Sequence, residues 1–419
     1  MRFPWLLILL SICLPAQDVR PKDVRDIAKS GSDSIPKLQE LLKNTDVNVR
    51  IEVVKQITQI GTQRSLDPLI LATQDNDPEV QIRAADGLVN FYLPGYVESG
   101  FGATIKRAGT SIRGHFTDTN DQVIDPYVTV RPDVIAALGK LVRGAGSMEA
   151  RANAARALGI LRGAAAVPDL IEAAHSKNTD VIYETLVAVQ KIHDQSAAPR
   201  ISFLLRDLNS KVQVAAIETT GLLQNKEALT DLTEVMGRAR DTKVKRAALT
   251  AIAMLPSETS RSIYAQYLHD KDDKVRGAAA EGYARLRRPE DLPMLEKAWQ
   301  EEGKTSPRLS LAFAQVMLGK TEVSEFSPLQ YLINNLNSAS YKGEASPLLV
   351  ELARDPKVRQ SLYRPLQTGT KAEKIGISGI LAVSGDQSSV AELEKRTHDA
   401  DPEVSKEALR AMRTLQARL

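Results

Sequence analysis

Three of the five histidines precede an aspartate, in the pairs His193-Asp194, His269-Asp270 and His398-Asp399. An imidazole beside a carboxylate can bind a metal ion or transfer a proton, provided that the fold gathers several such groups. These pairs lie near or after predicted helix ends, at different phases of an internal repeat, so stacking of repeats would not bring them together. We interpret them as solvated histidines near helix C-termini, where the helix dipole favours a cation.

A second group of oxygen ligands lies in Asp118-Thr119-Asn120-Asp121, followed by Asp125. This spacing is similar to a calcium loop, but the glycine and the final bidentate glutamate of an EF-hand are missing. Asp and Asn also favour turns for local reasons, and we expect a turn here. The sequence contains no glycine-rich phosphate loop, nucleophile elbow or Cys/His metal spacing.

The elements that would position any such residue are repeated helices. Asp77 can cap a helix, and Pro78 suits its first turn because the missing N–H has no partner there. An apolar stripe follows at helical spacing, formed by Val80, Ala84, Ala85 and Leu88. Residues 401–409 repeat this phrase nearly completely. One such repeat is too short to bury its stripe alone and must stack on its neighbours.

Positions equivalent to Val80 recur along the chain at Val49, Val80, Ala150, Val181, Val212, Val244, Val275, Arg308, Ser340, Ala372 and Val404. All but one of the separations are 31 to 33 residues, and the exception of 70 contains an insertion. A second helix precedes each position, and its start is marked in five units by Pro36, Pro68, Pro168, Pro199 and Pro328. Each unit is therefore predicted to be two antiparallel helices, with about ten to thirteen residues in each.

Proline-opened first helices, an Asp-Pro-Glu-Val turn and an Ala-Ala-x-x-Leu second helix resemble HEAT repeats. The short period is similar to the bacterial subclass named after the phycobilisome lyases, and the resemblance covers about residues 33 to 415. It implies an all-α, right-handed α-α superhelix of about eleven two-helix units. It also implies a platform whose second helices line a partner-binding face, because HEAT arrays serve mainly as scaffolds and only in a few cases as enzymes.

The resemblance also bears on the candidate chemistry. Deoxyhypusine hydroxylases, which have a similar fold, bind two irons through His-Glu pairs, but no histidine here is followed by glutamate. A basic row at Arg50, Arg151, Lys245 and Arg276 could line an anion-binding groove. It could instead form the interunit ladder of HEAT arrays, in which such residues bond to the acidic turn of a neighbouring unit. We favour the ladder because the row is interrupted at Gln81, Ile182 and Gln213.

The insertion, residues 93–131, distinguishes this chain from a generic array. Its apolar residues Val97, Phe101, Ile105, Ile112 and Phe116 recur at helical spacing, and Lys106, Arg107 and Arg113 lie close to them. A basic amphipathic helix is typical of segments that seek a partner groove or a lipid surface. Four glycines oppose helix formation in isolation, at about 1 kcal/mol each. We therefore expect the segment to order only against its own array, a protein partner or, through residues 95–116, a membrane surface. Residues 123–130 are expected to be extended.

The N-terminus predicts export. Arg2 precedes an apolar run from Phe3 to Leu14, then Pro15-Ala16, in the pattern of a secretory signal peptide that is too short to span a membrane. Cys13, the only cysteine, lies within it and offers a weaker alternative of lipoprotein anchoring. A mature chain without cysteine is compatible with the bacterial periplasm.

These patterns assign residues 1–16 to a signal peptide, 17–32 to an N-terminal capping helix, 33–92 to repeats 1–2, 93–131 to the insertion and 132–419 to repeats 3–11. With 55 basic and 52 acidic residues, the overall charge does not favour nucleic acid. We predict a non-enzymatic scaffold of the bacterial cell envelope that binds a protein partner and needs no cofactor or metal. The alternatives are an enzyme related to bilin lyases or metal-dependent hydroxylases, and a protein held at a membrane surface.

Overall fold

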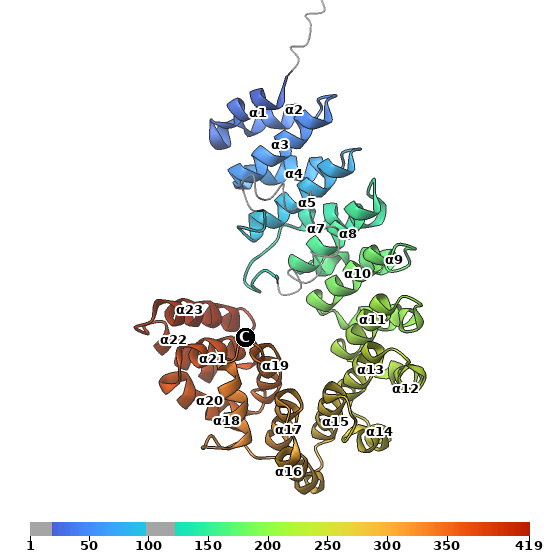
Figure 1. Cartoon of the computed structure of the whole chain (residues 1–419). Helices are drawn as coiled ribbons and strands as arrows, with labels where there is room; N and C mark the ends of the chain where they lie inside the picture. The colour runs from blue at the N-terminus through green and yellow to red at the C-terminus, as the bar shows by residue number, and fades with distance from the viewer. Residues whose placement is uncertain (1–18, 98–121) are drawn as a thin grey trace, which may run out of the picture. The chain divides into compact units, whose positions relative to one another are not determined.

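The computed structural model describes residues 19–97 and 122–419, which are predominantly helical and contain no strand in those two ranges (Figure 1). The chain divides into two compact units, residues 1–105 and 106–419, and the division falls between α5 and α7. The first unit contains α1 (Pro21–Ala28), α2 (Ile35–Leu41), α3 (Val47–Ile60), α4 (Leu66–Ala72) and α5 (Pro78–Tyr92).

The second unit begins with α7 (Pro132–Gly144), α8 (Met148–Ile160), α9 (Val167–Ala173), α10 (Thr179–Ile192), the 3₁₀ helix Pro199–Arg206, α11 (Ser210–Leu222), α12 (Leu229–Arg238) and α13 (Thr242–Met254). It continues with α14 (Arg261–Tyr267), α15 (Asp273–Leu286), α16 (Leu292–Glu301), α17 (Thr305–Met317), α18 (Pro328–Asn334) and α19 (Lys342–Leu352). Its last helices are α20 (Pro356–Thr368), α21 (Lys371–Ser384), α22 (Gln387–Arg396) and α23 (Pro402–Gln416).

From α2 onward, the described helices form eleven pairs of a first and a second helix, which confirms the predicted all-α architecture. Five of the first helices, α2, α4, α9, α14 and α18, have only seven residues and are shorter than we predicted. A 3₁₀ turn precedes most of these short helices and takes up part of the length that the sequence assigned to them. The second helices have 11 to 15 residues.

The helix starts follow the predicted chemistry. The Asp77 carboxylate caps α5 by accepting hydrogen bonds from the backbone N–H groups of Glu79 and Val80, and Asp401 caps α23 in the same way. Val80, Ala84, Ala85 and Leu88 are fully buried, which confirms the apolar stripe. Four of the five marker prolines occupy the first or second position of their helices, and Pro68 the third position of α4.

Small residues allow successive second helices to approach closely. A Cβ atom on Gly159 of α8 would lie 2.7 Å from the Cα of Ala188 in α10. The same relation holds between Gly221 of α11 and Ala251 of α13, at 2.9 Å. The abundance of alanine and the scarcity of aromatic residues therefore reflect backbone-to-backbone packing of the second helices.

Three of the predicted equivalent positions are wrong. In α17 the buried third residue is Pro307 rather than Arg308, and in α21 it is Glu373 rather than Ala372. Ser340 lies in the turn before α19. A long connection between α17 and α18 precedes the displaced positions near α19 and in α21, whereas the one-residue shift in α17 lies before it. The segment 123–130, which we expected to be extended, contains a turn and no strand.

Candidate functional site

Only one of the site residues predicted in the insertion belongs to the described part of the chain. The half-buried Val97 donates its backbone N–H to the side-chain oxygen of Asn90 at 2.9 Å. The others, Phe101, Ile105, Lys106, Arg107, Ile112, Arg113 and Phe116, lie outside the described residues. Asp118 to Asp121 of the calcium-like stretch also lie outside them, whereas Asp125 is described.

The described end of the insertion, residues 122–130, is a strap that is fastened to the second unit. Ile124 is buried, donates its backbone N–H to the carbonyl of Ile160 at 3.0 Å and accepts a hydrogen bond from the Arg162 Nε at 3.1 Å. The Lys191 ammonium donates to the carbonyl of Gln122 at 3.2 Å. The strap is therefore fixed to the C-terminal ends of α8 and α10.

Asp125 connects this strap to α23, the last helix. The Arg410 guanidinium forms a two-pronged contact with both Asp125 carboxylate oxygens at 2.7 to 3.1 Å, across 285 residues of sequence. Tyr127 donates its hydroxyl to the same carboxylate at 2.9 Å. Burial alone would raise the pKa of Asp125, but the hydrogen bonds from Arg410 and Tyr127 outweigh it and hold the pKa below its ordinary value. We call this contact the clasp.

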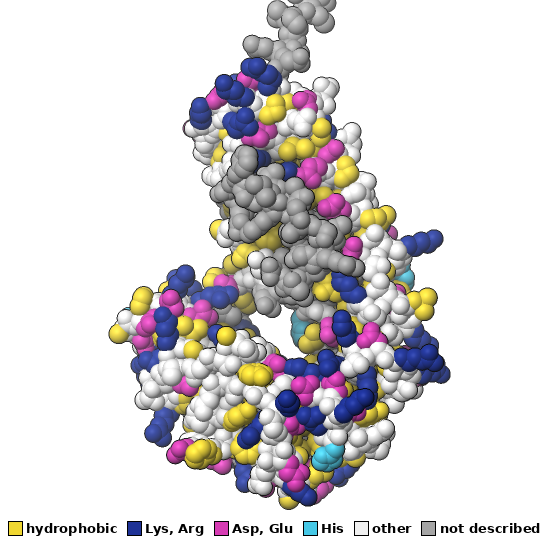
Figure 2. Space-filling model, in the orientation of Figure 1, with side chains coloured by type: hydrophobic (Ala, Val, Ile, Leu, Met, Phe, Trp, Pro, Cys, Tyr) yellow, Lys and Arg dark blue, Asp and Glu magenta, His cyan; other side chains and the backbone are white. Residues whose placement is uncertain are grey.

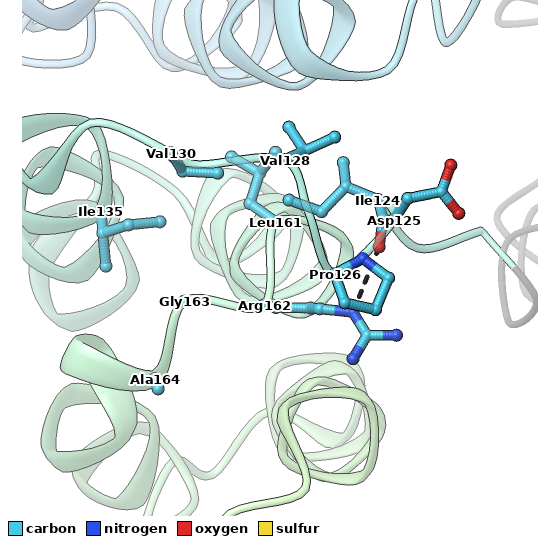
Figure 3. Close-up of a pocket in the computed structure, with 10 residues that line it drawn as sticks. All are labelled: Ile124, Asp125, Pro126, Val128, Val130, Ile135, Leu161, Arg162, Gly163 and Ala164. Carbon is cyan, nitrogen blue, oxygen red and sulfur yellow. Dashed lines mark hydrogen bonds between the residues drawn. The ribbon is translucent and has the colours of Figure 1, made fainter. Parts of the chain in front are cut away.

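A cavity of about 250 Å³ lies between the strap and the loop after α8 (Figure 3). Its lining includes the apolar residues Ile124, Val128, Ile135 and Leu161 together with Asp125 and Arg162. In Figure 3 the guanidinium of Arg162 extends away from Ile135 and Val130. Arg162 has a left-handed backbone with φ of 51°, which is unusual for a residue other than glycine. The strap and the loop after α8 thus enclose a small hollow with both apolar and polar lining.

A second connection between distant elements lies on α15. Arg285 donates to both carboxylate oxygens of Glu351 in α19 at 2.7 and 2.9 Å, and to Glu281 at 3.1 Å. Its guanidinium also lies 5.1 Å from the Phe313 ring centre in α17. Burial would lower the pKa of Arg285, but the two carboxylates outweigh it and raise the pKa. We call this cluster the inner bridge, because it reaches from α15 past α17 to α19.

The neighbouring surface is also held together by ion pairs. Lys274 of α15 donates to Glu344 of α19 at 2.7 Å and to Ser306 of α17 at 2.8 Å. Contacts that skip a unit require the N-terminal ends of α15 and α19 to converge. In Figure 1 these long helices lie toward the inside of the curve of the second unit.

Glu218 of α11 differs from these carboxylates. Its side chain is accessible to solvent, yet the surrounding protein desolvates it enough to raise its pKa. It occupies the ninth position of α11, as Glu281 of the inner bridge does in α15. The second unit thus has an inner face with fixed ion pairs at α15 to α19 and an accessible carboxylate at α11.

The basic row predicted at the fourth position of the second helices forms the interunit ladder. Arg50 donates to both carboxylate oxygens of Asp75 in the next unit at 2.7 and 3.0 Å, and to the carbonyl of Asn44 at 2.9 Å. Arg276 contacts Glu302 in the same way, and Lys245 contacts Asp270. Arg151 departs from this pattern and bonds the Val142 carbonyl. Gln81 and Gln213 also donate to backbone carbonyls.

The histidine–aspartate pairs lie at helix ends, as predicted. His193 terminates α10 in a left-handed conformation, while His269 and His398 follow the last residues of α14 and α22. Asp270 and Asp399 belong to the ladder through Lys245 and Lys374. Residues 19–97 and 122–419 contain no group of three or more His, Cys, Asp or Glu side chains placed to hold a metal. In the same ranges, no helix has the length and apolarity required to cross a bilayer.

The repeats and their packing define an α-helical repeat protein, and family comparison identifies the type. The HEAT-repeat pattern matches residues 4–89, 170–253 and 232–314, which together exceed half of the chain. The PBS lyase HEAT-like repeat matches residues 150–176. The chain therefore belongs to the HEAT-repeat family, and the predicted resemblance is confirmed.

Comparison with solved structures finds distant matches. An engineered protein is 18% identical, with 91% of this chain and 98% of that chain covered at a TM-score of 0.40. The complex of CpcE and CpcF of phycocyanin lyase from Nostoc sp. PCC7120 is 17% identical, covering 62% and 90%, at a TM-score of 0.37. A structure of Kap95p with RanGDP is 12% identical, covering 94% and 53%, at a TM-score of 0.46. No curated protein matches the chain.

Proposed function

We propose that this HEAT-repeat protein is a non-enzymatic scaffold that binds a protein partner in the bacterial cell envelope. The apolar leader predicted at residues 1–16 supports export, and the absence of cysteine after Cys13 is compatible with a periplasmic location. HEAT arrays commonly bind protein partners, which supports the binding role.

The observation that carries this proposal is the ladder. The ladder residues that bond an acid of the next unit fix the relative positions of those neighbouring units before a partner arrives. Arg50, Lys245, Arg276 and Lys374 repeat this arrangement along both compact units. A preformed surface loses little conformational entropy on binding, because its side chains are already held.

We place the main contact surface of the second unit on its inner face. Glu218 supplies an accessible carboxylate there, and the inner bridge holds the adjoining helices in place. The amphipathic residues of the insertion, including Phe101, Ile105 and Arg107, are proposed as a second contact on the strength of their sequence pattern.

Site-specific photo-cross-linking tests the proposal. A photoreactive amino acid at Glu218 is expected to cross-link one defined envelope protein in cells. The same group at Glu172, an exposed residue of α9, serves as the control because α9 belongs to the outer row of short helices. Equal labelling at both positions, or labelling of many proteins at Glu218, would contradict an inner binding face.

A further inference from the structure

Six cations gather at the turns that lead into four successive second helices of the second unit. Lys177, Arg240 and Lys271 precede the capping residues of α10, α13 and α15. Lys211, Lys243 and Lys274 occupy the second positions of α11, α13 and α15. We call these six residues the basic strip. They differ from the ladder residues, which occupy the fourth position and point into the array.

The position of these cations opposes the helix dipole. The N-terminus of a helix carries partial positive charge, so a cation there costs about 0.3–1 kcal/mol. Other second helices follow the dipole and have Glu79, Glu149, Asp180 or Glu403 at the second position. The first turns of α11 and α13 contain no acidic residue. The helix dipole therefore does not account for these cations.

Four of the six cations are available to a partner. Lys177, Arg240, Lys243 and Lys271 are exposed, and none forms an ion pair with a carboxylate of the described residues. The nearby aspartates are committed to capping, since Asp241 accepts from the N–H of Lys243 and Asp272 from the N–H of Lys274. The other two cations are already engaged, Lys211 over the Tyr183 ring and Lys274 with Glu344.

An apolar residue lies within the same row. Leu208 precedes the capping residue of α11, so it stands between Lys177 and Arg240 in the order of the units, and it is fully exposed. Figure 2 shows dark-blue Lys and Arg side chains along the outer rim of the second unit, where Figure 1 places α9 to α13. In successive units, the residue before the capping residue is therefore a cation (Lys177), an apolar residue (Leu208), a cation (Arg240) and a cation (Lys271).

We propose that the basic strip binds an extended acidic segment of the partner protein. Neighbouring units are about 10 Å apart, and an extended chain advances about 3.3 Å per residue. A segment with an acidic residue at about every third position would match Lys177, Arg240 and Lys271, with an apolar side chain against Leu208. The inference rests on the proposed scaffold function and names the chemistry of the partner.

The composition of the strip favours a peptide over other polyanions. Single-stranded nucleic acid is held by aromatic side chains on which bases stack. The six strip residues and Leu208 include none, and the adjoining Tyr183 ring is covered by Lys211. A membrane surface requires a broad apolar and basic face, whereas this row has a single exposed leucine at its turns. An acidic peptide with one apolar residue fits both the charges and Leu208.

Fluorescence anisotropy with a synthetic peptide tests the proposal on the full chain. The probe contains glutamate at every third position and one leucine in register with Leu208. We expect salt-dependent binding that weakens by roughly tenfold or more in Lys177→Glu/Arg240→Glu/Lys271→Glu. The matched control, Arg200→Glu/Lys226→Glu/Lys406→Glu, reverses three exposed cations elsewhere and should bind as the unmodified protein does. Leu208→Ser should weaken binding several-fold, because an apolar contact is lost.

Three results would overturn the proposal. The first is an equal loss in both triple variants, which would show attraction by net charge alone. The second is tighter binding of oligothymidylate or of phosphatidylglycerol vesicles than of the peptide. The third is unchanged binding in the strip variant. If the peptide result is negative while cross-linking at Glu218 persists, the strip assignment fails and the scaffold function stands.

Discussion

The clasp and the inner bridge both join distant parts of the second unit through one arginine, but they do so in different surroundings. At the inner bridge the Arg285 side chain is 11% exposed, packs against Phe313 and meets two carboxylates. At the clasp the Arg410 side chain is 53% exposed, and Asp125 belongs to a strap without regular secondary structure. A shielded pair resists salt and solvent, whereas an exposed pair is weak and reversible.

This difference separates two physical roles. The inner bridge fixes α15 and α19 at one separation, so it belongs to the permanent framework. The clasp can release without exposing a buried charge, because solvent already reaches both partners. We therefore expect the inner bridge to govern stability and the clasp to govern the position of the strap relative to α23.

The largest expected effect is at the inner bridge. Arg285→Met keeps the length of the side chain but leaves Glu281 and Glu351 without their guanidinium. Loss of one partner of a largely buried pair should lower the free energy of unfolding by about 3 kcal/mol. Chemical denaturation measures this change, and Arg238→Ala is the control because its side chain is 78% exposed.

A rescue variant identifies the cause. Arg285→Met combined with Glu281→Gln and Glu351→Gln removes the unpaired charges and should recover much of the loss. If the triple variant is as unstable as Arg285→Met, the lost contact with Phe313 rather than unpaired charge is responsible, and the comparison with the clasp fails.

The packing of α15 against α14 provides the next effect. A Cβ atom on Gly282 of α15 would lie 2.3 Å from the Tyr264 ring, whose hydroxyl donates to the Ile252 carbonyl at 3.1 Å. Gly282→Ala should therefore destabilise by about 1–3 kcal/mol through overpacking. Gly379→Ala in α21 meets nothing within 4 Å and should stabilise by up to about 1 kcal/mol. Thermal melts measure both effects. If the melting temperatures of the two variants shift in the same direction, α15 can move aside to accept the added methyl group.

The sequence predicted the parts of the fold that depend on local chemistry. Asp77 with Pro78 identified a helix start, and the periodic row containing Arg50 identified the ladder, because each involves one unit or its neighbour. Neither the clasp nor the inner bridge could be predicted. Asp125 and Arg410 are 285 residues apart and Arg285 bypasses a helix pair to reach Glu351, so both depend on how successive, slightly irregular helix pairs curve within the second compact unit. A signal for the clasp existed only in Asp125, which the sequence assigned to a turn.

Two arginines with a left-handed backbone conformation provide a further test of the strap. Arg287 after α15 has φ of 54° and Arg162 after α8 has φ of 51°. Arg287→Gly should stabilise the protein by about 0.5–1 kcal/mol, since glycine accepts this conformation without strain. Arg162→Gly relieves the same strain but loses the hydrogen bond to the strap, so the two effects should nearly cancel. An equal gain in both variants would show that Arg162 does not hold the strap.

The smallest energetic effect, and the largest geometric one, is expected at the clasp. Arg410→Gln and Asp125→Asn should each lower stability by less than about 1 kcal/mol, because the Arg410 side chain is 53% exposed to solvent. Their coupling, measured by a double-mutant cycle, should shrink from low to high salt as ions screen the charges.

The clasp should also respond to pH. Asp125 has a lowered pKa in the folded protein, so its contribution to stability is complete above the ordinary value of 3.8 and is lost as pH falls through the folded value. Fluorescence energy transfer between dyes at Gln122 and Lys406 should report release of the strap in both variants and at low pH. A salt-independent coupling, or an unchanged transfer efficiency in Arg410→Gln, would place the clasp in the permanent framework with the inner bridge.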